Sequence, residues 1–272
     1  MDEHPAFSIG FTFSQTSLQD YTDCPRRFQL RYLDRLAWPA VEIGPVLENE
    51  RRQKAGQLFH RLVQQHRLGL PAEKISPLAL TPDIRRWWEN YISYDFKVFG
   101  WTEYTELTIS APVGSHRLVA KFDLLAVKNG KALIFDWKTY HKRPRDDWMS
   151  TRLQTRVYRA LLIQAGAYLN GNQPLDPDMA EMIYWYADFP NEPSNFPYNL
   201  AQSNRDWDGL TALISEIANH RVFPLTDDEK KCKFCPYRSY CNRGIVAGEG
   251  DELESELAEP DINFEQIQEI AF

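Results

Sequence analysis

The sequence of 272 residues lacks the features that mark membrane-spanning and secreted proteins. No uninterrupted apolar run approaches the roughly 18 residues that a membrane-spanning helix needs. The amino terminus, MDEHPAFSIG, is acidic where a secretory signal is basic, and no apolar block follows it. A phosphate-binding G-x-x-x-x-G-K-[ST] motif is also missing, because Ala132 follows Gly130-Lys131. We therefore expect a soluble, cytoplasmic protein without membrane association and without an ATPase motor of its own.

Strong positive charge is absent as well, since the formal net charge is -7. Nine of the acidic residues, however, lie between Gly248 and Phe272, a segment that contains no lysine or arginine. Removing these nine leaves a charge of +2 on residues 1–247, so net charge does not exclude a nucleic-acid partner. We expect residues 1–247 to form one domain and residues 248–272 to form a flexible acidic tail.

Cysteine is scarce and unevenly placed. The only cysteines are Cys24, Cys232, Cys235 and Cys241, and the last three form a C-x2-C-x5-C cluster. Disulfides are uncommon in intracellular proteins, and free structural thiols do not explain three cysteines within ten residues. A metal or cluster site would use all four and would tie the start of the fold to its end. The spacing leaves zinc and an iron–sulfur cluster open, because both accept four thiolates.

The middle of the sequence predicts a β-hairpin. Residues 116–127 and 131–139 are rich in apolar side chains, and Asn129-Gly130 between them is a strong signal for a two-residue turn. With these two residues in the turn, the numbers of paired residues add up to 259. The turn therefore fixes which side chains face each other across the hairpin.

This register places two carboxylates opposite each other. Asp123 pairs with Asp136 and Lys121 with Lys138, and because side chains alternate along a strand, Asp136 and Lys138 share a face. The other face is expected to carry Phe122, Leu124, Ala126, Leu133, Phe135 and Trp137. Facing carboxylates in apolar strands repel each other and lose hydration, so they need a counter-charge.

Two interpretations of the carboxylate pair remain open from the residues alone. The first is a salt-bridged cluster with Lys121 and Lys138. The second is a divalent-metal site, because carboxylate oxygens suit Mg²⁺ or Mn²⁺. In that case Lys138 would orient an attacking water or help to deprotonate it.

Asp123 followed by Asp136-Trp137-Lys138 resembles the core motif of the PD-(D/E)XK nuclease superfamily, especially its RecB/AddB-like branch, which includes the CRISPR-adaptation nucleases. Four more stretches resemble motifs of that branch in the same order. They are residues 13–18 with Cys24-Pro25, residues 56–60, the Q-x-x-x-Y pair Gln154 and Tyr158, and the three C-terminal cysteines. Two positions differ from the usual pattern. Ala120 replaces a frequent glycine, and Asp136 stands where many relatives have glutamate.

The resemblance implies roles for individual residues. His60, Asp123, Asp136 and the Trp137 carbonyl would bind Mg²⁺ or Mn²⁺. Lys138 would be catalytic, and the two carboxylates would share in catalysis with the supporting pair Gln154 and Tyr158. Glu106 on the preceding strand is a further candidate acid. The four cysteines, Cys24, Cys232, Cys235 and Cys241, would hold a 4Fe-4S cluster, with Zn²⁺ as the alternative.

We interpret the sequence as a metal-dependent deoxyribonuclease, with exonuclease activity favoured, that acts on single-stranded DNA or free ends. DNA repair, recombination or CRISPR spacer acquisition would be its setting, with a separate helicase or CRISPR-adaptation proteins as partners. The basic residues expected to hold the DNA backbone are Lys121, Lys142, Arg143, Arg145 and Arg152. The alternative is a non-catalytic DNA-binding subunit of a helicase–nuclease assembly.

The fold that the resemblance implies is α/β, with a restriction-endonuclease-like αβββαβ core over about residues 82–187. Added N-terminal helices and a C-terminal four-cysteine module, made of residue 24 and residues 232–241, would complete it. Helices are expected over 16–31, 53–68, 82–99, 150–169 and 206–220. Strands are expected over 103–110, 116–127, 131–139 and 181–187, with a loop over 188–199.

Overall fold

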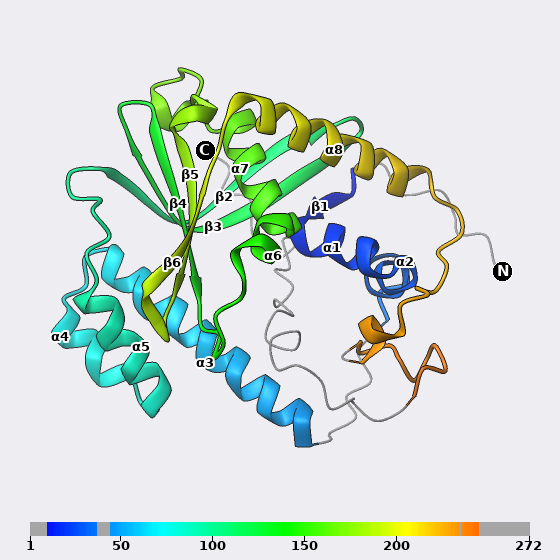
Figure 1. Cartoon of the computed structure of the whole chain (residues 1–272), viewed down its shortest axis with the longest axis horizontal. Coiled ribbons are helices and arrows are strands. Elements are labelled where there is room, and N and C mark those ends of the chain that lie inside the picture. The colour runs from blue at the N-terminus through cyan, green and yellow to red at the C-terminus, as the bar shows by residue number, and fades with distance from the viewer. Residues whose placement is uncertain (1–9, 37–43, 234, 245–272) are drawn as a thin grey trace.

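A mixed sheet lies at the centre of the molecule (Figure 1). The computed structural model describes residues 10–36, 44–233 and 235–244, with the backbone alone over 44–50, and the acidic segment 248–272 lies outside these ranges. Over the described residues the sheet has six strands in the order β1-β3-β4-β5-β6, and β2 pairs with the other edge of β3. The strands are β1 (Thr12–Ser14), β2 (Thr102–Val113), β3 (His116–Lys128), β4 (Lys131–Lys138), β5 (Ala180–Tyr186) and β6 (Phe189–Pro197).

Helices cover both faces of this sheet. The helices are α1 (Gln15–Asp23), α2 (Pro25–Phe28), α3 (Gly44–Arg67), α4 (Ala72–Ile75), α5 (Pro82–Ser93), α6 (Asp146–Thr151), α7 (Leu153–Ala165) and α8 (Leu200–Asn219). Shorter helical turns are η1 (Gln29–Leu33), η2 (Ser76–Leu78), η3 (Ala167–Asn170), η4 (Pro177–Met179) and η5 (Glu229–Cys232). None of the helices in the described ranges is both long enough and apolar enough to cross a bilayer. This arrangement confirms the predicted α/β fold of the restriction-endonuclease type.

Two hydrophobic cores lie on opposite faces of the sheet. The α7-side core gathers side chains from α1, α7 and α8, such as Leu18, Val157 and Ile214. The α3-side core gathers Phe59 from α3 and Trp87 from α5 against the other face. Strands between two such cores are apolar on both faces, which explains the long apolar runs of the hairpin.

The alternation of side chains reverses at one point of the β2–β3 pair. Phe122 packs with Leu125 in the α7-side core, whereas Leu124 packs in the α3-side core. The register between the strands is unchanged across this point, but Glu106, which faces Asp123, has a φ of 54°. A left-handed residue breaks the two-residue alternation of a strand. The prediction that Phe122 shares a face with Leu124 is therefore wrong.

The sheet also divides at Asp123. β1 pairs with residues 117–119 of β3, and β4 pairs with residues 124–128 on the same edge. β4 leaves β3 after Phe135 but stays paired with β5 as far as Lys138. Between these partners the edge of β3 opens, and Asp123 lies in this opening.

The hairpin turn and its register are confirmed. Asn129 and Gly130 have φ values of 52° and 79°, as a type I′ turn requires, and Leu124 pairs with Phe135 as predicted. The ladder ends there, so Asp123 and Asp136 lie one step beyond the last pair. Lys121 and Lys138 likewise lie outside the ladder.

Several predicted boundaries are wrong for local reasons. The helix over 16–31 is broken at Cys24, whose φ of -160° is extended, because a residue before proline avoids helical angles. The helix over 150–169 is broken at Arg152 (ψ 142°). Residues 188–199 contain β6 rather than a loop, since prolines are tolerated on an edge strand. The helices over 53–68 and 206–220 begin earlier than predicted, and the helix over 82–99 ends earlier.

Candidate active site

A cluster of ligand atoms lies where α3 crosses the opening in the sheet. His60, Glu106 and Asp123 each offer one ligand atom, and these atoms all lie within 4.8 Å of one another. His60 Nδ1 is 3.3 Å from Asp123 Oδ1, with side chains 31% and 17% exposed. We call these three residues the open group. One imidazole and two carboxylates suit a divalent cation such as Mn²⁺ or Mg²⁺.

A close approach of α3 to β4 positions His60. Gly56 lies one helical turn before His60, and a Cβ added there would come within 3.0 Å of Thr139 Oγ1. Only a glycine therefore fits without displacement of the Thr139 side chain. The short stretch from Gly56 to His60 thus combines a packing residue and a ligand on one face of the helix.

The charges of the open group are strongly coupled. Burial disfavours a charged imidazole, but the Asp123 carboxylate, aided by the other nearby carboxylates, raises the pKa of His60 to about 9. Burial also opposes ionisation of Asp123, yet His60 and the Trp137 N–H hold the pKa of this carboxyl below its usual range. Burial and the Asp123 charge raise the pKa of Glu106. These shifts favour a charged His60 and a charged Asp123 but disfavour the charge of Glu106. The repulsion between the two carboxylates is thereby reduced as long as no cation is bound.

A second group lies on the other side of β4, against α7, and is buried apart from the half-buried Gln154. Lys138 Nζ is 2.9 Å from Asp136 Oδ2, with side chains 7% and 4% exposed. The Gln154 amide donates to Asp136 Oδ1 at 2.8 Å, and its oxygen accepts from Lys138 Nζ at 3.0 Å. The Tyr184 hydroxyl donates to the same amide oxygen at 3.3 Å. We call these four residues the buried group.

One backbone bond joins the two groups. The Trp137 N–H donates to Asp123 Oδ2 at 2.8 Å, so Asp123 contacts β4 between Asp136 and Lys138. The structure thus brings the two aspartates and the lysine to the same point of β4. Asp136 belongs to the buried group and not to the set of ligand atoms within 4.8 Å of one another. The Trp137 carbonyl as a metal ligand stays a prediction.

The remaining predicted residues lie around this centre. Tyr158, one turn after Gln154 on α7, is buried and packs against Phe122 with ring centroids 4.9 Å apart and ring planes tilted by 44°. Its hydroxyl accepts from Gln15 at 3.4 Å. Lys121 forms an ion pair with Glu106 at the edge of the open group.

The basic residues after β4 have neighbours within their own segment. Arg143 donates to the Glu192 carbonyl at 2.8 Å and to Asp146 at 2.8 Å, which ties the segment to β6. Arg145 pairs with Asp147, and the Arg152 guanidinium lies 4.8 Å from the centroid of the Trp148 ring. Lys142 is exposed. A role for these residues in DNA binding stays a prediction.

The four cysteines lie at the junction of α1, α2 and the C-terminal turns. Burial raises the pKa of the Cys232, Cys235 and Cys241 thiols, to about 11 for Cys235. The electrostatic interaction with Cys24 contributes to the rise at each of the three thiols. The segments far apart in sequence thus meet at one place. No three cysteine sulfurs in the described chain lie within 4.8 Å of one another, since the only such group of potential ligands there is the open group.

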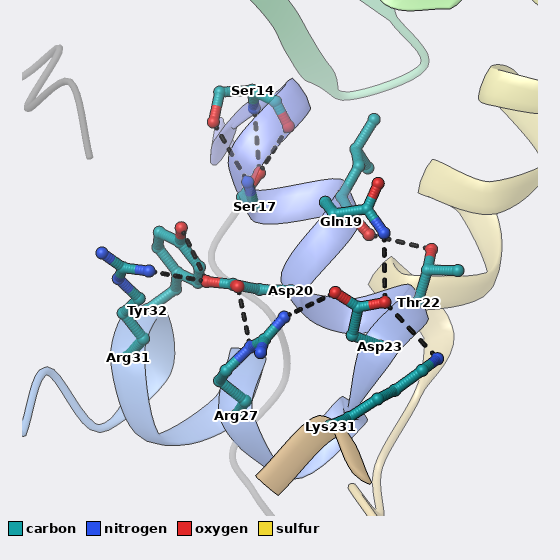
Figure 2. Close-up of polar contacts among 11 residues, drawn as sticks. Ser14, Ser17, Gln19, Asp20, Thr22, Asp23, Arg27, Arg31, Tyr32 and Lys231 are labelled. Atoms are coloured by element: carbon teal, nitrogen blue, oxygen red, sulfur yellow. Dashed lines mark hydrogen bonds and ion pairs between the residues drawn. The ribbon is translucent and has the colours of Figure 1, made fainter. Parts of the chain in front are cut away.

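A network of ion pairs holds this junction together (Figure 2). Arg27 Nε lies 2.8 Å from Asp20, and its terminal nitrogen lies 2.8 Å from Asp23. Arg31 also binds Asp20, at 3.0 Å, and Lys231 reaches Asp23 at 3.4 Å from the turn just before Cys232. The turn that leads into Cys232 is therefore anchored to α1 by an ion pair.

Two contributors to the site are difficult to predict from a single sequence. Glu106 was predicted only as a further candidate acid, and its left-handed backbone has no signal in a single sequence. Tyr184 was not predicted, because one tyrosine in an aromatic-rich strand does not show where its hydroxyl will lie.

The fold and the two groups define a class of enzyme: a hydrolytic nuclease with carboxylates and a lysine on adjacent strands. The chain belongs to the PD-(D/E)XK nuclease superfamily, whose family profile matches residues 12–242. No curated protein shows significant similarity to the sequence.

Two solved structures align with most of the chain. The "Putative exonuclease" of Eubacterium rectale is 10% identical, with a TM-score of 0.51 over 90% of this chain and 92% of that chain. The protein SSO0001 is 14% identical, with a TM-score of 0.40 over 89% of this chain and 91% of that chain. At 10% identity, the likeness to the Eubacterium rectale structure supports the fold alone.

Proposed function

We propose that this nuclease is a Mg²⁺- or Mn²⁺-dependent deoxyribonuclease, with exonuclease activity on single-stranded DNA or free DNA ends. The observation that carries the proposal is the meeting of the open group and the buried group at Asp123 and Trp137. The open group offers a nitrogen and carboxylate oxygens to a cation, and the buried group offers a fixed lysine. The "Putative exonuclease" of Eubacterium rectale has a similar fold, and its name agrees with this activity.

In this proposal His60, Asp123 and Glu106 would hold the divalent ion. Asp136, which pairs with Lys138 in the ion-free site, and the Trp137 carbonyl would complete its ligands. The bound ion lowers the pKa of an attacking water and offsets the charge that develops on the phosphate. Lys138 orients that water and stabilises the negative charge, while Asp136 and Gln154 keep the Lys138 side chain in one position. His60 must lose its proton before it can ligate a metal.

DNA would reach the site across the segment that follows β4. Lys142 and Arg145 are exposed there, and Lys121 and Arg152 lie to either side of the catalytic residues in sequence. Lysine and arginine side chains bind phosphates without regard to base sequence, as an exonuclease requires. Arg143 would help by holding the segment to β6.

We also propose a structural 4Fe-4S cluster on Cys24, Cys232, Cys235 and Cys241. The four cysteines come from two distant segments that meet at one junction. Four thiolates also suit Zn²⁺, which stays the alternative. The proposed setting of the protein is DNA repair, recombination or CRISPR spacer acquisition in the cytoplasm. A separate helicase or CRISPR-adaptation proteins would be its partners.

Cleavage of end-labelled DNA tests the proposed activity. We expect wild-type protein with Mg²⁺ or Mn²⁺ to degrade linear DNA but not closed circular single strands or RNA. Lys138→Ala should abolish cleavage, whereas Lys131→Ala, at the exposed far end of the same strand, should not. A folded, cluster-loaded wild type that binds DNA but never cuts it would contradict the proposal and favour a DNA-binding subunit.

The cluster has its own test. Protein purified without oxygen should contain about four irons and matching sulfide per chain, together with a broad visible absorbance band. Cys235→Ser should lose this band. A colourless wild type with one zinc per chain would contradict the iron–sulfur assignment while leaving the nuclease proposal intact.

A further inference from the structure

Tyr184 lies beside the catalytic strand without facing solvent. β5 lies beside β4 in the sheet (Figure 1). The two strands run parallel in a register that pairs Asp136 with Tyr184, so both side chains lie on the α7 side of the sheet. Tyr184 is 0% exposed. It therefore has no access to a substrate, and any influence on catalysis must pass through its neighbours.

The neighbour that matters is the Gln154 amide. Its NH₂ group donates to Asp136 at 2.8 Å, and its oxygen accepts from Lys138 at 3.0 Å and from the Tyr184 hydroxyl at 3.3 Å. An amide has two distinct ends, and a flip would turn the NH₂ group toward the Lys138 ammonium. The Tyr184 hydroxyl, as a second donor to the oxygen, favours the orientation that serves both charged groups.

The Tyr184 hydroxyl lies between two oxygen atoms. It is 2.8 Å from Thr155 Oγ1 and 3.3 Å from the Gln154 oxygen. Thr155 Oγ1 donates its own proton to the Met149 carbonyl at 2.6 Å, and this carbonyl uses its other lone pair to accept the Arg152 N–H at 3.2 Å. The Tyr184 proton is therefore shared between Thr155 Oγ1 and the Gln154 oxygen, and Tyr184 ties the Gln154 amide to α7 at Thr155.

The ring of Tyr184 adds to the same arrangement. Its centroid lies 5.3 Å from Lys138 Nζ, within the range of a cation–π contact. The ring and hydroxyl thus act on the two ends of one hydrogen-bonded unit, Lys138 and Gln154. We propose that Tyr184 is a positioning residue, which holds the Gln154 amide so that it bridges Asp136 and Lys138 during catalysis. This inference rests on the proposed nuclease activity.

Tyr184→Phe tests the inference because it removes only the hydroxyl. We expect kcat for DNA cleavage to fall about 3–10-fold, the effect of one lost hydrogen bond, with KM for DNA unchanged. The matched control is Tyr186→Phe, since Tyr186 is also buried on the same strand and face but binds Ser194 at 2.9 Å. An unchanged kcat in Tyr184→Phe, or an equal fall in Tyr186→Phe, would overturn the inference.

A double-mutant cycle separates positioning from general stability. If Tyr184 acts through Gln154, Tyr184→Phe should cause no further loss in a Gln154→Ala background. Equal losses in both backgrounds would contradict the inference, even if Tyr184→Phe lowers thermal stability through its lost contact with Thr155.

A measurement that does not depend on DNA cleavage distinguishes the positioning role of Tyr184 from the proposed nuclease activity. The side-chain NH₂ resonances of Gln154, identified by their loss in Gln154→Ala, should shift and broaden in Tyr184→Phe and stay unchanged in Tyr186→Phe. Resonances that do not respond to Tyr184→Phe would overturn the positioning role. A wild type that never cleaves DNA, with resonances that respond as expected, would overturn the proposed activity and leave only the geometric claim.

Discussion

The open group and the buried group differ in what they need. His60 and Asp123 are 31% and 17% exposed, and their pKa values shift in opposite directions because each is the main counter-charge of the other. Lys138 and Asp136 are 7% and 4% exposed, and Gln154 bridges them. In the open group the charges of His60 and Asp123 depend on each other and the side chains are partly exposed. In the buried group the charged side chains of Lys138 and Asp136 are enclosed and paired. We infer that the first is arranged to receive a cation and the second to hold a lysine still.

We expect the largest loss of stability and activity from Lys138→Met, a change within the buried group. This change would leave the Asp136 carboxylate buried without its cation, at a cost of about 3 kcal/mol in the free energy of unfolding. Loss of the positioned lysine should lower the cleavage rate by about 10²–10⁴-fold. Urea unfolding and a cleavage assay measure the two effects.

Lys131→Met on the same strand is the control, because Lys131 is exposed at the hairpin turn. Unchanged stability in Lys138→Met would show that the buried group is not a closed unit.

Glu106→Gln should affect metal affinity and leave the fold nearly unchanged. We expect Mn²⁺ affinity, measured by calorimetry, to fall about 10–100-fold. The free energy of unfolding should change by less than about 1 kcal/mol, because the Lys121 pair of Glu106 is partly exposed. Glu103→Gln is the matched control, since Glu103 lies on the same strand and binds Arg67 at 3.3 Å. Equal Mn²⁺ affinity in the two variants would remove Glu106 from the open group.

The raised pKa of His60 predicts how the stability of the metal-free protein depends on pH. The folded pKa of about 9 exceeds the unfolded value of 6.5, so the charged imidazole stabilises the fold fully below pH 6.5. This contribution, at most about 3 kcal/mol and smaller because solvent screens the partly exposed His60, is lost as pH rises through 9. Unfolding of wild type and His60→Gln between pH 6 and about 9.5 measures it. Parallel curves for the two proteins would contradict the coupling with Asp123.

The smallest expected effect concerns the position of α3. Gly56→Ala adds a methyl group 3.0 Å from Thr139 Oγ1 and moves His60, one turn later, by a few tenths of an ångström. Cleavage should fall about 2–5-fold, while the gain in helix propensity keeps stability within about 1 kcal/mol of wild type. Adding Thr139→Ala should restore the rate. A double variant as slow as Gly56→Ala would show that the contact with Thr139 is not the cause.

Local signals predicted part of this molecule well. Asn129-Gly130 fixed the hairpin register, and Leu124 pairs with Phe135 as expected. The predicted helix over 16–31 runs through Cys24-Pro25, but the proline ends the helix before it, because the residue before a proline avoids helical angles. The prolines of β6 suggested a loop, because a sequence does not show which strand lies at the edge.

The remaining features depend on contacts between distant segments. The left-handed Glu106 reverses the alternation of β2 and β3, so a strict two-residue period placed Phe122 on the wrong face. The Lys138–Asp136 ion pair was one of two interpretations of the carboxylates, and the structure shows it together with a separate group that can take a cation. Tyr184 reaches Gln154 only because β5 lies beside β4.

The central claim is that the open group receives a cation beside a prearranged lysine. Anomalous diffraction from crystals soaked with Mn²⁺ tests this claim most directly, because it locates the ion independently of activity. We predict an anomalous peak within bonding distance of Asp123 and His60, with Lys138 still bound to Gln154. An ion bound elsewhere, or a crystal of cleavage-competent protein without a peak between these residues, would contradict the account.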